Sequence, residues 1–220
     1  MSAVLPLLAG YGVEPDSRRV LKAFARAEAA IEAQRPALRY SEVLRRTFVQ
    51  MAKDLGFTPR VDDAAILFET FHAWPIFSDT TEGLRRIAAL VPIGLISNVD
   101  DDLIAHTVRR LDVSFSLVVT AEQVGAYKPD PKVFEHAAET LGRGGVASRS
   151  GWLHAGQSVF HDLVPARAFG LKTAHVMRPN SRGASAVSGG VSAVPGGAFE
   201  ADVSAPTVRE LADHVEENVK

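Results

Sequence analysis

Apolar residues recur at helical spacing through the first third of the chain. Val20, Phe24, Ala27 and Ile31 share one face of a predicted helix that begins after Asp16. Three further amphipathic helices follow it, over residues 41–55, 62–74 and 79–90. No segment before residue 90 alternates in the manner of a β-strand, so we expect this part to be helical.

Two of these helices carry N-terminal signals. Ser41 stands directly before the apolar positions of the second helix, and we expect its hydroxyl to cap that helix. Asp79 and Glu82 resemble a capping box, in which two side chains bond reciprocally to backbone N–H groups. Both patterns predict that these side chains are engaged locally.

After residue 90, short apolar runs alternate with helices. The runs predicted to be strands are 93–96, 117–119, 152–155, 173–176 and, more weakly, 201–203. Further helices are predicted over 101–111, 132–141, 163–169 and 207–219. Continuous apolar strands separated by helices are typical of a parallel sheet that is covered on both faces. We therefore predict an α/β fold with a Rossmann-like, doubly wound parallel sheet.

The change of pattern divides the chain into two predicted domains. Residues 1–77 are expected to form a helical cap, and residues 78–220 an α/β core. A Gly, Ser and Ala-rich stretch at about 180–198 is predicted to be a flexible loop. Ligands of an open parallel sheet bind beyond the carboxyl ends of its strands, so that edge is where a site is expected.

Polar side chains follow three of the predicted strands. Ser97 and Asn98 come after the first strand, Lys128 lies in the turn GAYKPDP after the second, and Asp162 follows the third. A hydroxyl donor and a full positive charge at one edge suit the stabilisation of negative charge on a substrate or intermediate. Asp162 is expected to orient Lys128 or to help hold a cation.

Each of these residues also has a purely structural explanation. Taken alone, Ser97 is better read as a helix cap, Lys128 as a solvated turn residue and Asp162 as an N-cap. His154 and His161 lie on unlike elements, which favours structural roles over metal ligation. The order of the polar residues, each after its own strand, favours a site.

Several segments together resemble a known family. LISNVD, GAYKPDPKVF and HAGQSVFHDLVPARAFGLKTAHV resemble the second, third and fourth motifs of haloacid dehalogenase-like (HAD) hydrolases, and WPIFSDTTEGLRRIA resembles the return from their helical cap. The dehalogenase-type branch is the most similar, because there a tyrosine precedes the motif-three lysine, as Tyr127 precedes Lys128 in this chain. The resemblance implies that Ser97 and Asn98 contact the attacked or anionic group and that Lys128 neutralises developing charge. Asp162 would be the motif-four acid, and further substrate contacts are expected from Tyr127, Gln157 and Ser158.

Gln157 bears on the cofactor that the resemblance implies. The family's phosphatases usually carry an acidic residue directly after the motif-four glycine, where it contributes to a magnesium site, and this chain has the neutral Gln157 there. Magnesium prefers carboxylate oxygens. We therefore expect no metal at the site. A magnesium site, made weaker by Gln157, is the alternative. The dehalogenase assignment is also incomplete, because proven dehalogenases tend to have asparagine in place of Val159.

The family's nucleophile is missing from this sequence. HAD enzymes attack with an aspartate in a pattern like Asp-x-x-Gly-Thr-Leu at the end of the first core strand, and no such pattern occurs in these 220 residues. We predict a hydrolase of the 2-haloacid dehalogenase type for a small anionic substrate, with the nucleophile outside this chain and the chain itself inactive. The strands at 93–96 and 152–155 should then not pair directly. A small-molecule phosphatase and a catalytically dead binding module are the alternatives.

Composition narrows the partners and the location. The 24 basic and 26 acidic residues are well mixed and give a formal net charge of −2, so no binding to nucleic acid or to an anionic membrane is expected. No apolar run approaches the length of a membrane span. The absence of cysteine excludes thiol catalysis and fits a cytoplasmic location. The apolar faces of the predicted cap are also compatible with a homodimer.

Overall fold

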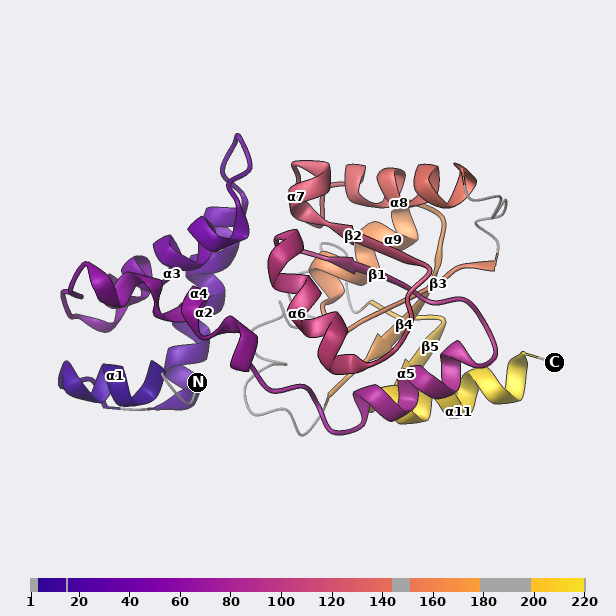
Figure 1. Cartoon of the computed structure of the whole chain (residues 1–220), viewed down its shortest axis with the longest axis horizontal. Helices are drawn as coiled ribbons and strands as arrows, with labels where there is room; N and C mark the ends of the chain where they lie inside the picture. The colour runs from indigo at the N-terminus through magenta and orange to yellow at the C-terminus, as the bar shows by residue number, and fades with distance from the viewer. Residues whose placement is uncertain (1–3, 15, 144–150, 179–198, 220) are drawn as a thin grey trace.

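The computed structural model describes residues 4–14, 16–143, 151–178 and 199–219. Its described residues before 90 form helices, and strands begin at Gly94. Figure 1 shows the helical part at the left and the α/β part at the right. The flexible loop expected at about 180–198 lies outside the described residues, and the boundary between the two domains near residue 77 stays a prediction.

The helical part is built around two long helices. Its elements are α1 (Val4–Gly10), α2 (Ser17–Glu32), α3 (Tyr40–Leu55), η1 (Asp62–Ala65), α4 (Ile66–Glu69) and η2 (Phe71–Ala73). Helices α2 and α3 pack against each other through fully buried side chains that include Val20, Leu44 and Phe48. Helix α3 ends at Gly56, whose φ of 86° lies in the left-handed region that favours glycine.

The rest of the chain alternates helices with short strands. The elements are α5 (Thr80–Ala88), β1 (Gly94–Ser97), α6 (Asp101–Leu111), β2 (Leu117–Thr120), α7 (Ala121–Val124), α8 (Lys132–Arg143), β3 (Leu153–Gly156), η4 (Val159–Leu163), α9 (Val164–Ala168), β4 (Lys172–Val176), β5 (Val203–Ala205) and α11 (Val208–Asn218). One sheet has the order β1-β2 and the other β3-β4-β5, and every pair is parallel. The α/β class with parallel strands is thereby confirmed.

Both faces of the β1-β2 sheet are covered. Ile96 and Val119 pack in one cluster with Val133 of α8. Leu95 and Val118, which alternate with them along the strands, belong instead to a cluster that contains Leu103 and Ile104 of α6 together with residues of the helical part. Successive side chains of a strand point to opposite faces, so this alternation places α6 and α8 on opposite sides of the sheet.

Helices α5 and α11 lie side by side below the sheets in Figure 1 and cover the second sheet. Ile87 of α5 and Leu211 of α11 share a cluster with Ala174 of β4. A Cβ atom added to Gly83 would lie 2.7 Å from the carbonyl oxygen of Val208, so the close approach of the two helices depends on this glycine.

The expected capping role of Ser41 is wrong. Helix α3 begins at Tyr40, and its N-cap residue Arg39 makes no side-chain capping bond. Instead the carboxylate of Asp100, in the α/β part, accepts the backbone N–H of Tyr40 at 2.7 Å and that of Ser41 at 3.0 Å. A buried carboxylate is a stronger acceptor than a local hydroxyl, and nothing in the local sequence announces it.

The expected capping box at Asp79 is also wrong. Asp79 makes no side-chain capping bond to α5. Its carboxylate accepts from the guanidinium of Arg178 at 2.5 Å and from the backbone N–H of Val208 at 2.8 Å. Glu82 pairs with Arg209 at 3.0 Å. These acids tie α5 to the C-terminal part of the chain, because distant partners outcompete the local N–H groups.

The third predicted helix, over 62–74, is broken into η1, α4 and η2. Near its break the hydroxyl of Thr70 donates to the carbonyl of Ile66 at 2.6 Å. Hydroxyls that bond back to the preceding turn often bend helices. A continuous helix over this range is therefore not what forms.

Strands β1 and β3 do not pair, as the sequence predicted. Within the described residues, β1 pairs with β2 and β3 pairs with β4. Side chains bridge the two sheets instead, since Ile96 and Trp152 share two clusters that also contain residues of α8. Leu153 in β3 is 36% exposed, whereas interior strands of parallel sheets are normally covered.

Candidate active site

The ends of the strands bring the predicted polar residues to one edge. Ser97 is the last residue of β1 and is only partly buried. After β2, the short helix α7 ends at Gly125, whose φ of 67° turns the chain toward Lys128. Asp162 lies in η4, just beyond β3. Each side chain therefore follows a strand of its own, which is the arrangement that the sequence predicted.

Lys128 is held in a buried ion pair. Its side chain is 9% exposed, and its Nζ atom lies 2.6 Å from Oδ1 of Asp162. The same ammonium donates to the carbonyl oxygen of Ile96 at 3.0 Å. Lys128 thus connects the carboxyl end of β1 with the turn after β3, and it fixes a full positive charge at the junction of the two sheets.

Asn98 positions the backbone of this lysine. The Oδ1 atom of Asn98 accepts the backbone N–H of Lys128 at 2.8 Å, and its Nδ2 atom donates to the carbonyl of Lys128 at 3.1 Å. Two reciprocal bonds fix the turn against the end of β1. The contacts of Asn98 in the described residues are those of a positioning residue, and its expected contact with substrate stays a prediction.

Asp162 stays ionised beside this lysine. Burial by itself would raise its pKa, but the adjacent Lys128 ammonium outweighs burial and lowers the pKa below the usual range. The backbone N–H of Ser158 donates to its Oδ2 atom at 3.1 Å. A Cβ atom at Gly156 would lie 2.5 Å from the Cβ of Asp162, so only glycine fits at the end of β3.

Two buried nitrogen atoms near the ion pair lack partners among the described residues. They are Nε2 of His154 and Nε2 of Gln157. Burial, with the positive charge of Lys128, lowers the pKa of His154 to about 4, so its ring is neutral near pH 7. Unsatisfied buried polar atoms are rare and commonly mark a functional or unfilled position.

Tyr127 and Ser158 have local partners. Tyr127 is 3% exposed, and its hydroxyl donates to the carbonyl of Leu38 in the helical part at 2.7 Å. The hydroxyl of Ser158 accepts the backbone N–H of His161 at 3.1 Å and begins η4. The expected substrate contacts of these two residues and of Gln157 stay predictions.

The sequence did not single out Glu28 and Glu32, which α2 brings to the same place. Oε2 of Glu32 accepts from Nδ2 of Asn98 at 3.4 Å, and the hydroxyl of Tyr40 donates to Glu28 at 2.5 Å. The only sequence feature that sets them apart is their spacing. Two acids four residues apart lie on the same side of the first predicted helix, but charges that flank the apolar stripe are ordinary in an amphipathic helix, so this spacing alone does not reveal their burial.

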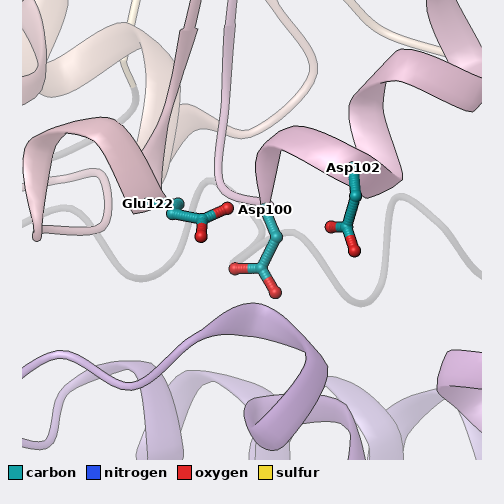
Figure 2. Close-up of side chains that lie close together, drawn as sticks. All are labelled: Asp100, Asp102 and Glu122. Carbon is teal, nitrogen blue, oxygen red and sulfur yellow. The ribbon is translucent and has the colours of Figure 1, made fainter.

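Figure 2 shows a trio of carboxylates, in which Asp100 and Asp102 point toward the helical part and Glu122 points toward Asp100. Their oxygens lie within 4.8 Å of one another, a spacing that suits a metal ion. Arg39 already pairs with all three, its nearest nitrogens lying 3.5, 3.7 and 3.2 Å from the respective oxygens. Because one guanidinium from the helical part pairs with all three carboxylates, we interpret the trio as a contact between the two parts of the chain.

The residues beside Lys128 offer little to a magnesium ion. Asp162 supplies one carboxylate, and that group is bonded to Lys128 and to the backbone of Ser158. Gln157 supplies a neutral amide. Magnesium sites usually combine at least one or two carboxylates with substrate and water oxygens, so the described residues alone fit the ion poorly.

A family model described as haloacid dehalogenase-like hydrolase matches residues 9–160. That range is more than half of the 220-residue chain. The chain therefore belongs to the haloacid dehalogenase-like hydrolase family.

Two curated proteins show partial similarity. "Haloacid dehalogenase-like hydrolase domain-containing protein 3" of Danio rerio is 30% identical over 109 residues, which cover 45% of this chain and 40% of that protein. "(S)-2-haloacid dehalogenase" of Pseudomonas fluorescens is 33% identical over 69 residues, 30% of each chain. The chain thus spans less than half the length of the curated relatives it matches.

Solved structures share the fold over almost the whole chain. An L-2-haloacid dehalogenase from Xanthobacter autotrophicus, with chloropropionic acid covalently bound, has a TM-score of 0.76 at 17% identity and covers 98% of this chain and 92% of its own. A defluorinating L-2-haloacid dehalogenase has a TM-score of 0.73 at 20% identity, with 98% and 87% covered. At these identities the likeness establishes the fold.

Proposed function

We propose that this protein hydrolyses a small anionic substrate of the 2-haloacid type. The single observation that carries the proposal is the buried ammonium of Lys128, bonded to Asp162 and to the carbonyl of Ile96 at the carboxyl ends of the strands. A fixed cation in a site from which water is excluded stabilises the negative charge that develops in a displacement or an acyl transfer.

The reaction proceeds through an ester of the enzyme. A carboxylate oxygen attacks C2 of the haloacid, the new C–O bond forms as the carbon–halogen bond breaks, and the halide leaves with the bonding pair. Water then adds to the acyl carbon of the ester, which regenerates the carboxylate and releases a 2-hydroxy acid and a proton. Lys128 neutralises charge on the attacking and reforming carboxylate, and Asn98 keeps Lys128 in place.

The nucleophilic carboxylate belongs, in this proposal, to a segment N-terminal to Met1 in a longer form of the protein. The observation that supports it is the split sheet, in which β1 and β3 leave one edge unpaired among the described residues. An apolar strand between them would cover Leu153 and place its C-terminal aspartate beside Lys128. Asp162 is a poor candidate, because Lys128 and Ser158 already engage both of its oxygens.

The test compares the 220-residue chain with a version extended upstream in its own reading frame. We expect the extended protein to release chloride from 2-chloropropionate without added magnesium, and the shorter chain to release none above background. Release of phosphate from p-nitrophenyl phosphate that requires magnesium would favour the phosphatase alternative. If the upstream frame holds a stop codon, and neither substrate reacts, the fold serves as a binding module.

Location and partners complete the proposal. The part of the chain that the structure describes holds no helix that is long and apolar enough to cross a membrane. We propose a cytoplasmic location, supported by the absence of cysteine, and no binding of nucleic acid, supported by the mixed charges. We also propose a homodimer through the apolar faces of the helical part, which the molecular mass measured in solution tests.

A further inference from the structure

Helix α2 carries two carboxyl groups toward the residues that hold Lys128. Glu28 and Glu32 are four residues apart and therefore one turn apart on the same face of the helix. Glu32 is 8% exposed, and its Oε2 atom accepts from Nδ2 of Asn98 at 3.4 Å. Since Asn98 bonds to the backbone of Lys128, only one side chain separates Glu32 from the residue that carries the positive charge.

Neither carboxyl group has an ion-pair partner among the described residues. The hydroxyl of Tyr40, from α3, donates to Glu28. The ammonium of Lys128 pairs with Asp162 instead. The guanidinium of Arg35 donates to the backbone carbonyl of Glu32 at 3.2 Å, and not to its carboxyl group. Tyr127, the other titratable group nearby, uses its hydroxyl on a backbone carbonyl.

A buried carboxyl group without a counter-ion favours its neutral form. Burial, reinforced by the neighbouring Glu28, raises the pKa of Glu32 to about 9, although Asn98 and Lys128 act in the opposite direction. Burial raises the pKa of Glu28 to about 7. At neutral pH, Glu32 therefore carries a proton and is a hydrogen-bond donor, which an ionised glutamate is not.

We propose that Glu32 determines the substrate charge that the site accepts, by donating a hydrogen bond from its protonated carboxyl group to the anionic group of the substrate. The inference rests on the proposed function, since it assumes an anion bound beside Lys128. Glu28 acts through Glu32, because a negative charge at Glu28 makes ionisation of Glu32 less favourable. Ionised Glu32 repels the anion, so affinity falls by about tenfold per pH unit above the pKa of Glu32.

A merely structural role makes a different prediction. Glutamine at position 32 keeps the size of the side chain and an oxygen that accepts from Asn98, and its amide remains a donor at every pH. Glu32→Gln should therefore preserve the fold and the binding of the anion, and remove only its dependence on pH. If Glu32 served packing alone, Glu32→Gln would leave the pH dependence of anion binding unchanged.

The experiment measures the dissociation constants of 2-chloropropionate and of sulfate by calorimetry with the 220-residue chain. Both probes keep a constant charge from about pH 6.5 to about pH 9.5, since their acidic groups ionise far below that range. We expect weaker binding at high pH for the wild-type chain and constant affinity for Glu32→Gln. Glu28→Gln should move the onset to lower pH. The matched control, Glu42→Gln, alters a half-exposed glutamate of α3 and should follow the wild type.

An unchanged pH dependence in Glu32→Gln overturns the inference. If the 220-residue chain binds neither probe, the same variants are compared in the extended protein by the pH dependence of KM, with kcat recorded separately. Turnover of 2-chloropropionate with a pH-dependent KM that survives in Glu32→Gln refutes this inference alone. No turnover of any anionic substrate refutes the proposed function, and the inference falls with it.

Discussion

Replacing Lys128 by methionine should destabilise the protein strongly at neutral pH. The variant keeps most of the side-chain volume but removes the ammonium 2.6 Å from Asp162, whose side chain is 16% exposed. Removing one partner of a buried pair leaves an uncompensated charge and typically costs about 3–5 kcal/mol in the free energy of unfolding. Urea denaturation measures this loss.

The loss should depend on pH with a definite sign. In the wild type, the lowered pKa of Asp162 contributes stability that is present above the carboxyl's unfolded pKa and lost as pH falls through the folded pKa. In Lys128→Met, burial without the cation raises the pKa of Asp162, so stability falls as pH rises. Both effects make the difference between the two proteins largest near pH 7 and smallest in acid.

An exposed ion pair supplies the control. Arg85 and Asp112 lie 2.5 Å apart, but their side chains are 55% and 81% exposed. Arg85→Met should cost less than about 1 kcal/mol, because water and salt screen such pairs. If Lys128→Met costs no more than this control, or if its cost is the same at every pH, then Asp162 is not a buried charge that Lys128 neutralises.

Three further changes test other parts of the structure. Glu32→Gln should remove a decline in stability of about 1.4 kcal/mol per pH unit between about pH 5.5 and about pH 8, where the folded state holds a proton that the unfolded chain has lost because the pKa of Glu32 is raised from 4.5 to about 9. Chemical denaturation across that range measures the slope, and equal slopes in the two proteins would contradict the prediction. Gly156→Ala should displace Asp162 and cost about 1–3 kcal/mol by overpacking, with lost activity in the extended protein; unchanged stability would show that the end of β3 yields. Asp100→Ala should cost about 1–3 kcal/mol and speed amide exchange at the first turn of α3, where two N–H groups lose their acceptor; unchanged exchange there would mean that other groups hold this end of the helix.

The sequence predicted what local patterns determine. The continuous apolar run of the first strand predicted that Leu95 and Ile96 would be covered on opposite faces of the sheet, and the alternation of strands and helices predicted the order of the polar residues. The Lys128–Asp162 contact could be anticipated, because both residues follow strands whose carboxyl ends share one edge.

Contacts between distant segments could not be read in the same way. Asp79 has the sequence of a capping residue but binds a guanidinium 99 residues away in the chain, and Asp100 caps a helix that begins 60 residues earlier. Glu32 reads as an ordinary helix acid, and only the packing of α2 against the α/β part buries it. These choices depend on tertiary geometry, which local propensity does not contain.

The most direct measurement of the proposed mechanism is the site of covalent modification. The extended protein is acid-quenched during turnover of 2-chloropropionate, digested and mapped by mass spectrometry. We expect a carboxyethyl ester on an aspartate in a peptide N-terminal to Met1, and none in the variant with asparagine at that position. An ester on Asp162, or turnover through an adduct on any residue of the 220, would contradict the proposal that the Lys128 site serves a nucleophile from an upstream strand.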